Sequence, residues 1–95
     1  MIVNRYKVTV KQGHMQEVVE LVKEMRKQGG YDCRLYQSHL GTRDQIACEF
    51  EFEDYAAYDK FWTEWYALPD TPAFLEKWNE MTIAGGTNEL WWLIE

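Results

Sequence analysis

One polar side chain that could take part in binding or catalysis lies on an otherwise apolar face in the first segment of the chain. From Ile2 to Val10 the residues alternate between two faces, and Asn4 falls on the apolar side together with Tyr6. A side-chain amide in apolar surroundings costs free energy unless it is hydrogen-bonded. Asn4 is therefore either a satisfied polar group of the core or a polar group that lines a pocket.

A histidine near the end of the second alternating segment is the other polar residue of interest. His39 shares the parity of Leu35 and Gln37 in the segment from Tyr31 to Leu40, which places all three on the helix-facing side near the sheet end. Its imidazole titrates near neutral pH, so it could act as a base or hold a carboxylate. The same position is also typical of a strand-end histidine with ordinary titration. Gln37 is a further polar group on this side of the sheet.

The sequence carries none of the motifs that mark the common enzyme classes. It has no nucleophile–base pair, no glycine-rich phosphate loop and no metal-ligand spacing. Cys33 and Cys48 are too few and too far apart for a disulfide framework or a zinc site, and we interpret both as small buried hydrophobic residues. Gly29-Gly30 and Gly85-Gly86 each follow an expected helix, so we expect both to end helices. No cofactor and no metal are expected.

The chain has more bulky apolar surface than one small core absorbs. Its 95 residues fit a single domain, residues 1–95, and 16% of them are aromatic. A domain of this length buries only about 60–65% of its unfolded surface, so its own core gives modest stability. The surplus of aromatic side chains therefore predicts a dimer interface, a ligand cavity, or both.

The net charge excludes two classes of partner. It is −6 at pH 7, whereas binding to nucleic acids or anionic membranes requires a cationic surface. No apolar run approaches the roughly 18 residues of a membrane-spanning helix, and no signal peptide precedes the first strand. We expect a cytoplasmic protein without nucleic-acid or membrane partners.

The hydrophobic pattern predicts the element order βαββαβ. Alternation with a period of two predicts strands, and apolar residues at helical spacing predict helices. The second helical stripe is aromatic, with Asp54 as its N-cap, and Pro69 divides it into two parts. The expected strands are Ile2 to Val10, Tyr31 to Leu40, Gln45 to Glu53 and Thr87 to Glu95, and the helical stripes run from Met15 to Met25 and from Tyr55 to Met81.

This order is the ferredoxin-like arrangement, an α+β fold in which a four-stranded antiparallel sheet carries both helical regions on one face. The other sheet face is left open. Symmetrical pairing of the central hairpin places Arg34 opposite Glu51 and Tyr36 opposite Glu49, with Trp91 nearby on the last strand. Matched charges and a Trp predict that this open face packs against a second copy of the chain, although a solvated face is the simpler interpretation of the charges alone.

The whole chain resembles the dimeric α+β barrel superfamily, which includes antibiotic-biosynthesis monooxygenases, haem-degrading monooxygenases, EthD-like and NIPSNAP-like proteins. The resemblance rests on the element order, on the aromatic second helical region with its proline break, and on the opening strand from Asn4 to Thr9. In the haem-degrading branch, an asparagine of this strand points into a pocket between sheet and helices. The resemblance implies a homodimer and a site in that pocket.

The resemblance also suggests which chemistry to expect. Haem-degrading relatives add a Trp and a His from the second helical region, and this region has no histidine here, so haem degradation is not expected. The cofactor-independent monooxygenases need an apolar slot with an Asn, a Trp and an Arg or Tyr that polarise an enolate and oxygen. Asn4, Tyr58 and Trp62 or Trp65 match these types. The candidate catalytic residues are Asn4, His39 and Trp62, and the candidate ligand contacts are Tyr6, Gln37, Tyr58, Phe61, Trp65 and Trp78.

Three functions are compatible with these features. The chain could bind an elongated or flat apolar molecule between sheet and helices, or act on it as a cofactor-independent monooxygenase-like enzyme. It could also be a structural or regulatory homodimer whose aromatic side chains simply fill the core. The fold carries many functions, so it does not choose among them. A cavity beside Trp62 and Trp65 would favour the first two.

Overall fold

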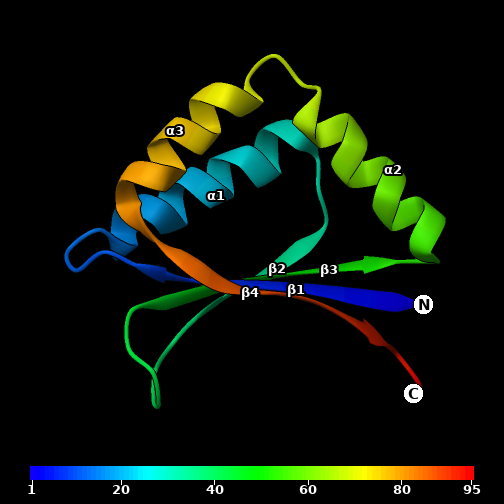
Figure 1. Cartoon of the computed structure of the whole chain (residues 1–95), viewed down its shortest axis with the longest axis horizontal. Coiled ribbons are helices and arrows are strands. Elements are labelled where there is room, and N and C mark those ends of the chain that lie inside the picture. Colours follow the sequence, from blue (N-terminus) through cyan, green and yellow to red (C-terminus); the bar gives the residue numbers. More distant parts are fainter.

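The computed structural model describes residues 1–95 and follows the predicted order, with the second helical region in two parts (Figure 1). The elements are β1 (Ile2–Val10), α1 (Met15–Gly29), β2 (Cys33–Gln37), β3 (Gln45–Phe52), α2 (Tyr55–Tyr66), α3 (Thr71–Met81) and β4 (Thr82–Trp92). The strands form one antiparallel sheet in the order β2-β3-β1-β4. All three helices cover the same face of this sheet (Figure 1), so the predicted ferredoxin-like α+β fold is confirmed. None of the helices combines the length and the hydropathy that crossing a bilayer requires.

The local signals at the helix ends act as the sequence predicts. Gly30, with φ of 67°, adopts the left-handed conformation that closes α1. The Asp54 carboxylate accepts a hydrogen bond of 2.8 Å from the backbone N–H of Ala57 and so caps α2. The chain then breaks around Pro69 and starts again at Thr71. Together these stops set the angle between α2 and α3, which lie over different ends of the sheet (Figure 1).

The core lies between the sheet and the helices. Ile2, Asn4, Val8 and Val10 of β1 are all buried on the helix-facing side. This confirms the predicted parity of the first strand, and of the two alternatives for Asn4 the structure shows the buried polar group of the core. The main apolar cluster joins β1 to β2 and β3 and to α1 and α3; its members are Val8, Val10, Val18, Val22, Cys33, Ile46, Cys48, Phe50, Trp78 and Met81.

The pairing of the central hairpin differs from the prediction by two residues. Arg34 lies opposite Glu49 and not Glu51, and Tyr36 lies opposite Ala47. A shift of two residues preserves which face each side chain occupies, because strand side chains alternate with a period of two. The charged residues therefore remain on the open face, although their partners change.

The cause of this shift is a longer hairpin loop. The strand expected from Tyr31 to Leu40 ends at Gln37. Beyond it, the backbone N–H of Ser38 donates to Gln45 O at 2.9 Å, and the Ser38 hydroxyl accepts from Gln45 N at 3.0 Å. These bonds close the loop two residues earlier than the glycine-containing turn that we expected.

The prediction that Gly85-Gly86 ends a helix and that the last strand starts at Thr87 is wrong. The α3 helix runs directly into β4. Between the pairs Lys7–Thr87 and Thr9–Ile83, three residues of β4 face one residue of β1, which is a β-bulge. Gly85 and Gly86 form this bulge with φ of 109° and 89°. At Gly86 a Cβ atom would overlap the backbone carbonyl oxygen of Lys7, so the close approach of the two strands requires glycine.

The open sheet face carries an ion-pair cluster centred on Glu49. The Glu49 side chain is only 8% exposed, although no helix covers this face. Arg5 donates to Oε2 through Nε at 3.0 Å and Nη2 at 2.8 Å, and Arg34 donates to Oε1 at 3.2 Å. Arg34 also donates to Glu51 at 3.1 Å, and the Tyr36 hydroxyl lies 3.4 Å from Glu49 Oε1. These bonds, chiefly those from Arg5, lower the pKa of the Glu49 carboxyl.

We expect Gly86→Ala to destabilise the chain much more than Gly13→Ala. Both glycines have similar φ values, 89° and 88°, so alanine costs about 1–2 kcal/mol of backbone strain at either site. Only at Gly86 does the added Cβ meet backbone, whereas nothing lies within 4 Å at Gly13. Thermal unfolding should therefore show a melting temperature for Gly86→Ala that is lower than that of Gly13→Ala by roughly 8 °C or more. Equal melting temperatures would contradict the bulge.

The Glu49 cluster predicts a defined pH dependence of stability. Because the folded state lowers the Glu49 pKa below the ordinary 4.5, the ionised carboxylate stabilises the fold above that value and loses this effect as pH falls through the lower folded value. Glu49→Gln should thus lower the free energy of unfolding by about 1–2 kcal/mol at pH 7, a modest figure because both arginines are half-exposed. In urea titrations the deficit should shrink between about pH 5 and pH 3. Glu53→Gln, at an exposed residue without an ion pair, serves as control and should show no such convergence.

Candidate functional site

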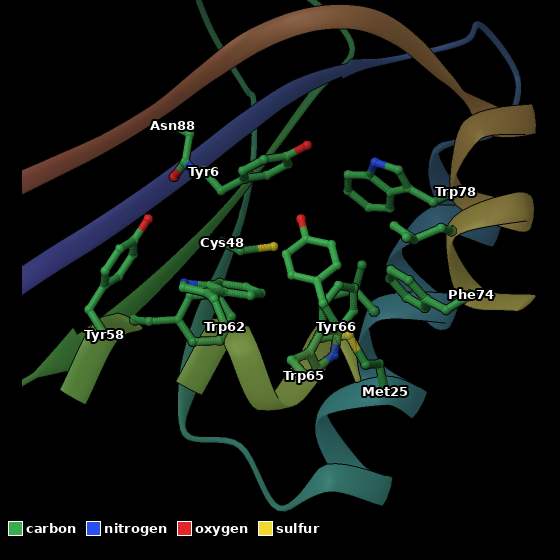
Figure 2. Close-up of a pocket in the computed structure, with 13 residues that line it drawn as sticks. Tyr6, Met25, Cys48, Tyr58, Trp62, Trp65, Tyr66, Phe74, Trp78 and Asn88 are labelled. Carbon is green, nitrogen blue, oxygen red and sulfur yellow. The ribbon is translucent and has the colours of Figure 1, made fainter. Parts of the chain in front are cut away.

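A cavity of about 160 Å³ lies between the helix-facing side of the sheet and the three helices (Figure 2). Every helix and three of the four strands contribute to its wall. Twelve of its thirteen lining residues are hydrophobic, so the wall suits an apolar molecule. The lining residues are Tyr6, Val22, Met25, Cys48, Phe50, Tyr58, Trp62, Trp65, Tyr66, Phe74, Leu75, Trp78 and Asn88.

Aromatic rings in mutual contact build the helical wall of the cavity. Trp62 and Trp65 meet edge to face, with ring centroids 5.5 Å apart. Trp65 meets Phe74 in the same way at 5.6 Å, and Phe74 stacks on Trp78 at 5.9 Å. The row crosses from α2 to α3, so the break at Pro69 lets two helices present one curved aromatic surface. At the two ends of the row Trp62 and Trp78 also meet Phe50 and Tyr6 of the sheet, whereas Trp65 and Phe74 contact only rings of the helices.

A hydrogen-bonded group of three side chains joins the sheet to α2 behind this wall. The Asn4 side chain is completely buried, and its Oδ1 accepts a hydrogen bond of 3.1 Å from the indole Nε1 of Trp62. Its Nδ2 donates to Asn88 Oδ1 at 2.6 Å and to Glu89 O at 3.0 Å. Both ends of the amide are therefore occupied. Asn4 does not face the cavity itself but positions Trp62 and Asn88, which do.

The polar groups at the cavity belong to three tyrosines and one asparagine. Tyr6, Tyr58 and Tyr66 place hydroxyl groups along it, and Figure 2 shows the Tyr66 hydroxyl pointing from α2 toward the sheet strand that carries Tyr6. Burial raises the pKa of the Tyr6 hydroxyl above its ordinary value of 10, so this group stays protonated at neutral pH. These groups can exchange hydrogen bonds with a bound oxygen atom without carrying charge.

The thiol in the cavity wall stays protonated at neutral pH. Burial raises the pKa of the Cys48 thiol to about 12, and burial also raises the pKa of Cys33. Both cysteines are buried and free, as the sequence predicts. No group of three or more His, Cys, Asp or Glu side chains is arranged to hold a metal ion.

Most of the residues proposed from the sequence come together at the cavity. Trp62 from the candidate catalytic set lines it, and so do four of the candidate ligand contacts, namely Tyr6, Tyr58, Trp65 and Trp78. Phe61 is half-buried one layer behind, with its ring centroid 5.5 Å from that of Phe50 and 4.9 Å from that of Trp62.

Two candidates lie elsewhere. The expectation that His39 lies on the helix-facing side is wrong, because β2 ends at Gln37 and His39 is exposed in the loop that follows. Gln37 is exposed as well, beside a small hollow near the hairpin that is separate from the cavity. The early closure of the loop at Ser38 accounts for both positions.

The prediction from sequence also left out residues that line the cavity, among them Tyr66 and Asn88. Tyr66 follows Trp62 at helical spacing and could have been found by extending the aromatic stripe by one turn. Asn88 could not be found in this way. Its side chain reaches Asn4 only because β4 pairs with β1 so that Asn88 lies directly opposite Tyr6. That register depends on the bulge at Gly85-Gly86.

The hydrogen bond between Asn4 and Trp62 predicts strong energetic coupling. Asn4→Leu leaves the indole N–H without its partner and should lower the free energy of unfolding by about 2–3 kcal/mol. Trp62→Phe leaves the buried Asn4 oxygen without a donor. The double variant has neither the unpaired indole N–H nor the unpaired Asn4 oxygen. In urea unfolding its loss of free energy of unfolding should therefore be smaller than the sum of the two single losses by roughly 1–2 kcal/mol. The cycle of Asn4→Leu with Trp78→Phe, whose indole makes no hydrogen bond to Asn4, should be close to additive; equal coupling in both cycles would contradict the assignment.

Comparisons with known proteins identify the fold. No protein-family model matches the chain, and no curated protein does. An uncharacterized NIPSNAP domain protein from Burkholderia xenovorans superposes with a TM-score of 0.82 over 98% of this chain and 94% of its own, at 15% identity. A NIPSNAP family protein of unknown function from Agrobacterium tumefaciens gives 0.83 over 96% and 86%, at 17% identity. A structure of an antibiotic biosynthesis monooxygenase gives 0.73 over 100% of both chains, at 16% identity. The chain thus has the fold shared by the NIPSNAP proteins and the antibiotic biosynthesis monooxygenases, as the sequence resemblance implied.

Proposed function

We propose that the chain binds a flat, largely apolar small molecule in the cavity between the sheet and the aromatic helices. The observation that carries this proposal is the cavity itself, because its aromatic wall is held open by contacts among Trp62, Trp65, Phe74 and Trp78. Trp62 and Trp78 also meet Phe50 and Tyr6 of the sheet, whereas Trp65 and Phe74 pair only with rings of the helices and leave the space between them and the sheet unfilled. A non-catalytic structural or regulatory homodimer without a ligand therefore explains less of the structure.

The size of the cavity limits the molecule. An engineered apolar cavity of about 150 Å³ in another protein binds benzene. The present space of about 160 Å³ accordingly suits one ring or a small fused pair of rings. A long acyl chain or a larger polyketide would need the α2 and α3 walls to move apart. The tyrosine hydroxyls and Asn88 suit a molecule that carries an oxygen function on its ring.

A cofactor-independent oxygenase acting in the same cavity is the second candidate. It is supported by the shared fold with an antibiotic biosynthesis monooxygenase, which covers both chains completely. Such chemistry begins with removal of a proton from the substrate, which needs a base close to neutral pH. The cavity has no histidine or carboxylate, and the pKa values of Tyr6 and Cys48 are both raised. Binding without catalysis is therefore the function that the geometry supports better.

We further propose that the working unit is a homodimer formed through the open sheet face. The buried Glu49 cluster gives this face a fixed, self-complementary set of charges, and Trp91 is 57% exposed beside Val3 on it. Tyr36 and Leu93 are also exposed. Apolar surface of this kind on a small chain is typical of an interface. In such a dimer the cavity remains on the opposite side of the sheet, one in each copy.

One experiment tests both proposals. Native mass spectrometry of the chain titrated with 1-indanone, a flat ketone with a fused ring pair, should give twice the mass of the chain and up to two bound ligands. Trp65→Ala should weaken binding by roughly tenfold, because it removes part of the aromatic wall. Trp91→Ala, on the other face of the sheet, should leave the affinity per chain unchanged and weaken the dimer. A monomer at all concentrations would overturn the dimer, and no saturable binding of any one- or two-ring molecule would overturn the binding function.

A further inference from the structure

The orientation of the buried Asn4 amide is fixed by groups that can form only one kind of hydrogen bond. The indole nitrogen of Trp62 has a hydrogen and no free lone pair, so it must donate, and the atom it reaches at 3.1 Å must be the Asn4 oxygen. The backbone carbonyl of Glu89 can only accept, so the atom 3.0 Å from it must be the Asn4 nitrogen. Rotating the amide by 180° would break both bonds inside a completely buried site.

This fixed orientation determines that of Asn88. The second hydrogen of Asn4 Nδ2 points at Asn88, which must present its oxygen, and the two atoms lie 2.6 Å apart. The Asn88 nitrogen, with both its hydrogens, is therefore on the side of the amide away from Asn4. It makes no hydrogen bond within the chain. Asn88 is an exposed residue in the cavity wall, on the same sheet face as Tyr6 and directly opposite it in register (Figure 2), so in the free chain water can reach this nitrogen.

We propose that Asn88 is the specificity-determining residue of the cavity and selects flat molecules that carry a hydrogen-bond acceptor, such as a ring carbonyl, over hydrocarbons of the same shape. This inference rests on the proposed binding function and names its ligand class. A ligand that covers Asn88 removes water from the amide. A carbonyl oxygen replaces that water, whereas a methylene group leaves the N–H unpaired.

The other polar groups of the cavity lack this selectivity. The hydroxyls of Tyr6, Tyr58 and Tyr66 can each donate or accept, and rotation of the O–H bond adapts them to either kind of ligand. The Asn88 amide cannot adapt, because its oxygen is committed to Asn4, and Asn4 is committed to Trp62 and the β4 backbone. The Trp62 indole N–H thus fixes the orientation of the Asn4 amide, and the Asn4 amide fixes that of Asn88 in the cavity wall.

The test compares two ligands of the same shape, 1-indanone and indane, by isothermal titration calorimetry on the full chain. The wild type should bind the ketone roughly fivefold to tenfold more tightly than the hydrocarbon, as expected for one hydrogen bond. Asn88→Asp keeps the oxygen that Asn4 needs but replaces the donor with a carboxylate oxygen, so the preference should be lost or reversed. Asn79→Asp makes the same change at an exposed position on α3 outside the cavity and should keep the wild-type preference.

A second measurement reports on the hydrogen bond directly. In ¹⁵N-labelled protein, 1-indanone should shift the side-chain amide resonances of Asn88 more than indane does, while the indole resonance of Trp62 should show that both ligands enter the cavity. Equal affinity for ketone and hydrocarbon in the wild type, or an unchanged preference in Asn88→Asp, would overturn the role of Asn88 and leave the binding function intact. Binding of neither ligand would overturn the binding function and this inference with it.

Discussion

The hydrogen bond from Trp62 to Asn4 is the contact on which the arrangement of the site depends. It ties α2 to the centre of the sheet at a point where only an apolar contact would otherwise exist. Because Asn4 also bonds to β4 at both Asn88 and Glu89, one buried amide fixes the relative positions of three elements. Apolar packing alone tolerates small slides between a helix and a sheet, whereas a buried amide with all its bonds made does not. The hydrogen bond therefore helps to set the distance between α2 and the sheet, on which the cavity depends.

The β4 strand places the third member of this group, and its geometry depends on two glycines. The bulge at Gly85-Gly86 changes the register of β4 against β1, so that Asn88 comes opposite Tyr6 and within reach of Asn4. Without the two extra residues, the side chains of the second half of the strand would lie two positions further along. The bulge at Gly85-Gly86 thereby determines that Asn88 is the β4 residue in the cavity wall.

How much of this the sequence predicts depends on the range of the interactions. Alternation in β1 and the aromatic stripe of α2 and α3 are local patterns, and they correctly predict the fold, the helix-facing position of Asn4 and five of the thirteen residues that line the cavity. The role of Gly85-Gly86 is not local, because a glycine pair after a helical stripe suits a helix end and a β-bulge equally well. The prediction of the hairpin register was wrong for a similar reason, since the register depends on the hydrogen bonds between Ser38 and Gln45 and not on the glycine of the turn. Asn88 contacts a residue 84 positions away, and no short pattern encodes such a contact.

The free-energy cost of the cavity is appreciable compared with the total stability of so small a chain. Enclosed, unfilled apolar space costs roughly 24 cal/mol per Å³, which would give about 4 kcal/mol for about 160 Å³, and the cost here is smaller because part of the wall, including Tyr66, is exposed to solvent. A chain of 95 residues has a total stability of only about 5–14 kcal/mol. An apolar space that is lined by rigid aromatic rings and has an amide N–H in its wall is what a binding site requires, and a ligand in that space would add stability that grows with its affinity.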